Sequence, residues 1–121
     1  MQSYKELNVY KKSYIQAREI YKLSQKFPLE ERYGLTSQIK RAATSIPLNI
    51  AEGYGKVERG KEVVRFLSMA RGSSAELEVL LNFSKDFGYI LEEEYIEFLK
   101  RCEEIGKMLT GLIKSITDNY N

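Results

Sequence analysis

The sequence predicts an all-α protein, an antiparallel up-down-up-down four-helix bundle, from three observations. Its 121 residues include only two prolines and eight glycines, and Lys, Glu, Leu, Ile and Ala dominate the long stretches between them, which is a helical composition. Four of these stretches repeat apolar residues at steps of three and four. The connections are short, and short connections force neighbouring helices to reverse direction. A chain of this length is expected to make a single domain over residues 1–121.

The first helix is expected from about residue 3 to residue 26. Phe27 and Pro28 end it, because the residue before a proline avoids α geometry. The regular spacing of its tyrosines predicts that they serve core and interface packing. The apolar face of this helix consists of Leu7, Tyr10, Tyr14, Ala17 and Tyr21.

The second helix is expected from residue 35 or 36 to about residue 54, with Pro47 inside it. A proline removes one backbone hydrogen bond and clashes with the carbonyl of Ala43, which predicts a kink at Pro47, with early termination of the helix as the alternative. Gly53 or Gly55 then ends the helix in left-handed geometry. Its apolar stripe consists of Leu35, Ile39, Ala42, Ala43, Ile46 and Ile50.

Two further helices are expected over residues 60–86 and from after Leu91 to about residue 117, with "DFGY" closing the earlier one. The residues of the third helix that face inward are Phe66, Met69, Ala70, Ser73, Leu77, Leu80 and Leu81. The fourth carries a main stripe and a second stripe beside it: Tyr95, Leu99, Cys102, Gly106, Leu109, Ile113 and Ile116, then Phe98, Ile105 and Leu112. This apolar arc is wider than one packing partner requires, which predicts self-association.

The residue types exclude most enzyme and metal sites. Histidine is absent and Cys102 is the only cysteine, so neither a Glu-x-x-His pair nor a Cys and His cluster can form. No glycine-lysine segment has P-loop spacing. We therefore expect no catalytic residue, no metal ligand, no cofactor and no enzyme activity. No apolar run approaches the roughly 18 residues that cross a bilayer, which predicts a cytoplasmic protein without membrane contact.

Basic residues are concentrated in the first half of the chain. Residues 1–60 carry 11 Lys and Arg against 6 acids, whereas residues 61–121 carry 8 against 11. Such asymmetry suits an anionic polymer, although a single lysine on a helix is more often a solvated surface residue. Binding of RNA or DNA backbone would require that the cations cluster in space. The candidate contacts are Lys11, Lys12, Arg18, Lys22, Lys40, Lys56, Arg59, Lys61, Arg65 and Arg71.

A stripe of polar residues lies beside the apolar stripe of the second helix: Gln38, Arg41, Ser45, Asn49 and Glu52. We expect these residues to form a hydrogen-bonded seam with Ser74, Glu76 and Glu78 of the third helix, within the bundle or between protomers. Ligand recognition is the alternative. An arginine next to an apolar stripe must pair, and the fork of its guanidinium suits a carboxylate or a phosphate.

The segment "LTSQIKRAATSIPLNIAEGYGK", residues 35–56, resembles the four-helix-bundle proteins encoded by intervening sequences within bacterial 23S rRNA genes. The likeness extends to "FPLEERYGL", residues 27–35, and to "FLSMARGSSAELE", residues 66–78. It implies a cytoplasmic bacterial protein that assembles into a ring-like homopentamer and has no known catalytic activity.

The same fold group includes the accessory protein of diversity-generating retroelements, which is also pentameric and binds nucleic acid and its reverse transcriptase. The resemblance therefore implies a nonenzymatic homo-oligomer that binds RNA or DNA. A scaffold that assembles and binds a protein partner, such as a reverse transcriptase, without contact to nucleic acid is the alternative.

Overall fold

The structure is a computed structural model that describes residues 3–56 and 60–120. Its elements are the 3-10 turn η1 (Tyr4–Glu6), α1 (Asn8–Ser24), the 3-10 turn η2 (Leu29–Glu31), α2 (Leu35–Lys56), α3 (Gly60–Asp86) and α4 (Glu92–Tyr120). The described residues contain four α-helices and no strand, so the all-α prediction is confirmed.

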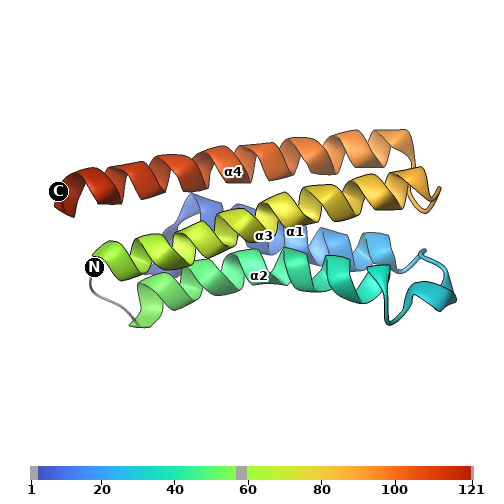
Figure 1. The fold of residues 1–121 in the computed structure, drawn as a ribbon, viewed down its shortest axis with the longest axis horizontal. Coiled ribbons are helices and arrows are strands. Elements are labelled where there is room, and N and C mark those ends of the chain that lie inside the picture. The colour runs from blue at the N-terminus through green and yellow to red at the C-terminus, as the bar shows by residue number, and fades with distance from the viewer. Residues whose placement is uncertain (1–2, 57–59, 121) are drawn as a thin grey trace.

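The four helices lie along one long axis, and each runs back along the helix before it (Figure 1). α1 packs on α2, α2 on α3 and α3 on α4. The α1–α4 contact, which closes the bundle, is the least extensive of the contacts between helices. The core therefore lies between all four helices, and α2 and α3 form its most tightly packed side.

The buried face of α2 is the one expected from the sequence. All six residues of the predicted stripe are buried, and Ile39, Ile46 and Ile50 have no exposed surface. On α3 the prediction is right for four leucine and alanine positions but wrong for Met69, whose side chain is 47% exposed. The residues of α4 that are buried in the core are Phe98, Cys102, Ile105 and Leu109.

Helix α1 differs from its prediction in both its start and its buried face. It begins at Asn8, because Leu7 has an extended backbone with φ −69° and ψ 130°. It ends at Ser24, two residues earlier than expected. Its buried residues are Val9, Ser13, Gln16, Ala17, Ile20, Leu23 and Ser24.

The predicted tyrosine face of α1 is wrong as a core face. Tyr14 is 50% exposed and Tyr21 is 45% exposed. The core face carries polar residues instead, which conceal its periodicity in the sequence. Ser13 Oγ donates to the carbonyl oxygen of Tyr10 at 3.0 Å, and Ser24 Oγ to that of Tyr21 at 2.9 Å. These local bonds satisfy the buried hydroxyls.

Helix α2 passes through Pro47 without interruption, so the alternative of early termination is wrong. A kink at Pro47 stays a prediction. The expected left-handed end at Gly53 or Gly55 is also wrong, since both lie within the helix. A Cβ on Gly53 would lie 2.9 Å from Cβ of Phe66. Gly53 is therefore required for the close approach of α2 to α3, and not for backbone freedom.

The turn between α3 and α4 is set by one glycine and one carboxylate. Gly88 has φ 80°, and the N–H of Tyr89 donates to the carbonyl oxygen of Ser84 at 2.9 Å, which ends α3 as the segment "DFGY" predicted. Glu94 Oε1 accepts the N–H of Leu91 at 2.8 Å, which caps α4. Burial opposes ionisation of Glu94, but the Leu91 amide and the Lys26 ammonium outweigh it and lower the pKa of this carboxyl.

Candidate nucleic-acid interface

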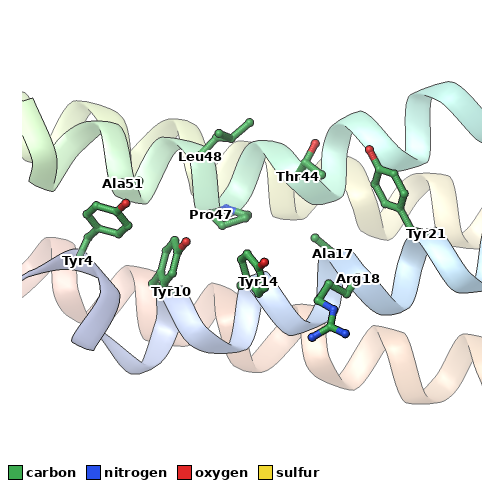
Figure 2. A pocket seen from close by; sticks show the side chains of 10 residues that line it. All are labelled: Tyr4, Tyr10, Tyr14, Ala17, Arg18, Tyr21, Thr44, Pro47, Leu48 and Ala51. Carbon is green, nitrogen blue, oxygen red and sulfur yellow. The ribbon is translucent and has the colours of Figure 1, made fainter.

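A groove of about 640 Å³ runs between α1 and α2 (Figure 2). Tyr4, Tyr10 and Tyr14 form a row along its α1 side, and the ring of Pro47 faces this row (Figure 2). The ring centroids of Tyr4 and Tyr10 are 5.0 Å apart, and those of Tyr10 and Tyr14 are 6.0 Å apart. The remaining lining residues are Ala17, Arg18, Tyr21, Thr44, Leu48 and Ala51. We call this feature the tyrosine groove.

The tyrosine groove is mostly apolar, although all four of its aromatic residues are tyrosines, three of which contact one another. Burial, with the neighbouring Tyr4 and Tyr14, raises the pKa of the Tyr10 phenol, so its hydroxyl stays protonated at neutral pH. Leu48 is 65% exposed at the α2 edge. Lys40 Nζ lies 4.9 Å from the centroid of the Tyr21 ring, within the range of a cation–π contact.

Sequence reasoning missed the α2 side of this groove. Thr44, Leu48 and Ala51 recur at steps of four and three on a face next to the core stripe. That spacing is a visible signal in the sequence, whereas the contribution of the Pro47 ring to a groove depends on its position relative to α1. Pro47 is buried, and its ring lines the groove opposite the row of tyrosines (Figure 2).

The charges of the bundle are divided between its helices. α1 and α2 together carry seven Lys and Arg against two Glu. α4 carries four Lys and Arg against seven Asp and Glu. Since α1 and α2 pack side by side, one side of the bundle is basic. The side formed by α4 is acidic.

Three of the candidate cations form one exposed stripe on α1, at steps of seven and four: Lys11, Arg18 and Lys22. We call this set the basic stripe. Among the described residues none of the three makes an ion pair. Arg18 is also a lining residue of the tyrosine groove, and its guanidinium points away from α2 (Figure 2).

The other candidate cations are dispersed. Lys12 Nζ pairs with Glu104 Oε1 of α4 at 3.1 Å. Arg65 pairs with Glu62 at 3.2 Å and lies over the Phe66 ring. Arg71 Nη1 donates to Thr110 Oγ1 at 3.4 Å, and Lys61 is exposed near the start of α3. The Lys56 side chain and Arg59 lie outside the described residues.

In the polar stripe of α2, hydrogen bonds join the two middle residues, Ser45 and Asn49, to each other and, through Ser45, to α3. Asn49 Nδ2 donates to the Ser45 carbonyl oxygen at 2.8 Å and to Ser45 Oγ at 3.0 Å. Ser45 Oγ and Ser73 Oγ are 2.8 Å apart. The α3 partner of the seam is therefore Ser73 and not Ser74. Gln38 and Arg41 are exposed, and Glu52 is half-buried. No carboxylate of the described residues pairs with Arg41, and its pairing with a phosphate stays a prediction.

The α3 residues predicted for this seam lie elsewhere, because they occupy other faces of α3. Ser74 Oγ donates to the Cys102 carbonyl oxygen of α4 at 3.4 Å. Glu78 lines a small pocket on the α4 side, where burial, and then the charge of Glu103, raises the pKa of its carboxyl. Glu76 is exposed.

Cys102 is the small buried side chain that its place in the α4 stripe predicted. It has no exposed surface, and Gln16 Nε2 donates to its Sγ at 3.4 Å. Burial raises the pKa of the thiol to about 12, so it stays protonated and unreactive at neutral pH. Gln16 Oε1 is buried without a hydrogen-bond partner.

Within residues 3–56 and 60–120, no group of His, Cys, Asp or Glu is arranged to hold a metal ion. No helix in the same part of the chain is long and apolar enough to span a membrane.

Residues 5–111 match the sequence family described as 23S rRNA-intervening sequence protein. The chain belongs to this family. A crystal structure of a protein of unknown function from the S23 ribosomal protein family of Bacteroides thetaiotaomicron is similar, with 30% identity and a TM-score of 0.80. The match covers 88% of this chain and 98% of that chain. Among curated proteins, none matches the chain.

Proposed function

We propose that this member of the 23S rRNA intervening-sequence family is a cytoplasmic, nonenzymatic homo-oligomer that binds RNA or DNA backbone. The observation that supports this proposal is the division of charge, with seven basic against two acidic residues on α1 and α2. The basic stripe of Lys11, Arg18 and Lys22 is its centre, because its exposed cations have no carboxylate partner among the described residues. Lys40 extends the positive surface onto α2.

A single copy would bind only weakly. Affinity for a polyanion comes largely from counterion release, and each phosphate contact changes the slope of log K against log salt by about 0.9. Three contacts therefore give a modest, sequence-independent affinity. A homo-oligomer repeats the stripe once per copy, and a polymer that touches several copies gains avidity. The pentamer implied by the family would repeat it five times.

The test is the salt dependence of binding. Labelled structured RNA and a DNA duplex are titrated with the protein at low and moderate salt. The triple variant Lys11→Gln, Arg18→Gln, Lys22→Gln should weaken binding to both and lower the salt slope by about three. A matched control replaces Lys100, Lys107 and Lys114 of α4 with Gln and should bind like the unchanged protein. Absence of binding at low salt, or equal loss in both variants, would contradict the proposal.

The scaffold alternative is supported by a different observation, the exposed apolar lining of the tyrosine groove. A protein partner, such as a reverse transcriptase, would contact this surface without nucleic acid. An oligomer that binds neither RNA nor DNA at low salt would favour this alternative. Light scattering gives the copy number, since each chain has a mass of 14.1 kDa.

A further inference from the structure

The tyrosine groove is a concave apolar surface that its own chain leaves open. Tyr14 is 50% exposed, Tyr21 45% and Leu48 65%. Soluble proteins rarely expose contiguous apolar surface of this kind unless it binds another molecule. A groove between two packed helices has the shape that receives the side chains of a third helix.

A convex apolar surface lies on α3 of the same chain. Val79, Phe83 and Phe87 are spaced by four residues, so they follow one another along one face of the helix and its end. Their side chains are 55%, 48% and 55% exposed. The Phe83 and Phe87 ring centroids are 5.7 Å apart, so the two rings form one continuous surface. We call these three residues the α3 ridge.

The groove and the ridge carry complementary charges. Two cations lie at the groove: Arg18 is one of its lining residues, and Lys40 Nζ lies 4.9 Å from the centroid of the Tyr21 ring. The ridge is flanked by the exposed acids Glu76 and Asp86, each one turn from a ridge residue. Lys85 Nζ lies 3.8 Å from Asp86 Oδ1 and offsets part of that charge, so Glu76 is the acid without an ion pair among the described residues.

The ridge also has the helical spacing of four that fits between two helices. The ridge is exposed in its own chain and takes no part in the lining of that chain's groove. A ridge that fills the groove therefore belongs to a second copy.

We propose that the α3 ridge of one copy docks in the tyrosine groove of the next. This contact rests on the proposed homo-oligomer and names its two surfaces. It is heterologous, since each copy contributes a different surface to each neighbour. An open chain of copies therefore keeps one free groove at one end and one free ridge at the other. Such a contact continues until a ring closes or a filament forms.

The heterologous geometry gives a complementation test. Leu48→Glu places a charge in the groove, and Phe83→Glu places a charge on the ridge. Both side chains are surface residues, 65% and 48% exposed, so the fold should be retained, and circular dichroism checks it. Each variant alone should be monomeric by light scattering. An equimolar mixture should form a dimer of twice 14.1 kDa and nothing larger, because it contains one intact groove and one intact ridge that can meet.

The matched control is Ile96→Glu on α4, where the side chain is 43% exposed and outside both surfaces. It should keep the mass of the unchanged protein. If the unchanged protein is oligomeric and either variant keeps its mass, the contact lies elsewhere and the inference is overturned, while the proposed homo-oligomer stands. Two monomeric variants that do not complement would also overturn it, in favour of a symmetric contact. A monomeric unchanged protein would overturn both. Nucleic-acid binding is measured in a separate titration, in which a monomeric variant keeps the basic stripe but loses the avidity of the oligomer.

Discussion

The α2–α3 contact and the α1–α4 contact differ in how closely the helices approach and in what lies between them. Between α2 and α3, Gly53 lets the backbone approach the Phe66 side chain, and Ser45 and Ser73 share a hydrogen bond at 2.8 Å. Between α1 and α4, the longer Gln16 side chain reaches the Cys102 thiol, and one of its polar atoms has no partner. Small residues thus specify a close contact, whereas a long polar residue fills a wider one. Gly53→Ala at the first contact and Gln16→Leu at the second should therefore change the free energy of unfolding in opposite directions.

The largest effect is expected at the buried face of α2. Ile50 has no exposed surface, and Ile50→Ala should lower the free energy of unfolding by about 2–5 kcal/mol, because it removes buried methyl groups and leaves a cavity. Urea denaturation followed by circular dichroism measures this change. Ile96→Ala on α4, where the side chain is 43% exposed, is the control and should change the free energy by less than about 0.5 kcal/mol. Similar losses at both positions would contradict this view of the core.

Gly53→Ala should have the next largest effect on the free energy of unfolding. The added Cβ would lie 2.9 Å from Cβ of Phe66, and overpacking of this kind costs about 1–3 kcal/mol. The gain in helix propensity, about 1 kcal/mol, offsets part of it. Gly55→Ala is the matched control, because its added Cβ meets no atom of the described residues within 4 Å outside its chain neighbours and its own turn of helix backbone, and it should be stabilising. Thermal denaturation measures both effects. If the two substitutions stabilise the protein to the same degree, the distance between α2 and α3 does not depend on the absence of a side chain at Gly53.

Cys102 should give the α1–α4 contact a dependence on alkaline pH. Burial raises the pKa of the Cys102 thiol from its ordinary value of 9.0 to about 12 in the folded chain. Above pH 9 the unfolded chain loses this proton while the folded chain keeps it, so the contribution to stability is complete below pH 9 and falls as pH rises toward 12.

The measurement compares urea midpoints of the unchanged protein and of Cys102→Ala at pH 7, 8, 9 and 10. Lysines and tyrosines titrate in both proteins and cancel in the difference. The advantage of the unchanged protein should be constant to pH 8 and then shrink. An advantage that stays constant to pH 10 would show that the folded thiol ionises normally.

Gln16→Leu should give the smallest effect and the opposite sign. The substitution removes a buried amide oxygen that has no hydrogen-bond partner and keeps a similar side-chain volume. Relief of that unsatisfied group should raise the free energy of unfolding by about 1 kcal/mol, less the weak bond to Cys102 Sγ. Thermal denaturation measures it. A loss of stability would mean that the amide stabilises the α1–α4 contact through a bound water.

The contrast between these contacts also explains which parts of the fold could be predicted from the sequence. The buried face of α2 is continuous in apolar residues, so periodicity alone identified it. The core face of α1 includes Ser13 and Gln16, and its stripe was therefore placed on the tyrosines instead. The role of Gly53 depends on Phe66 from another helix, which local sequence rules do not contain. They describe a glycine near a helix end as a terminator.

The candidate site was predictable to a similar extent. The excess of cations in the first half of the chain located the basic side of the bundle. Which cations remain available depends on α4, since Glu104 neutralises Lys12 but no acid of the described residues pairs with Lys11. The seam was predicted to include Ser74, but Ser45 bonds to Ser73, the residue before it. Ser73 faces α2 and Ser74 faces α4, and the spacing along α3 does not distinguish these two positions.

The buried thiol of Cys102 has a consequence for measuring how the bundle opens. It is the only thiol of the chain, and it lies in the core where α1, α3 and α4 meet. A thiol reagent in excess can react only when this region opens, so the rate of a single chemical reaction reports the frequency of that opening. Cys102 is thus an intrinsic probe of native-state opening, and no label has to be introduced.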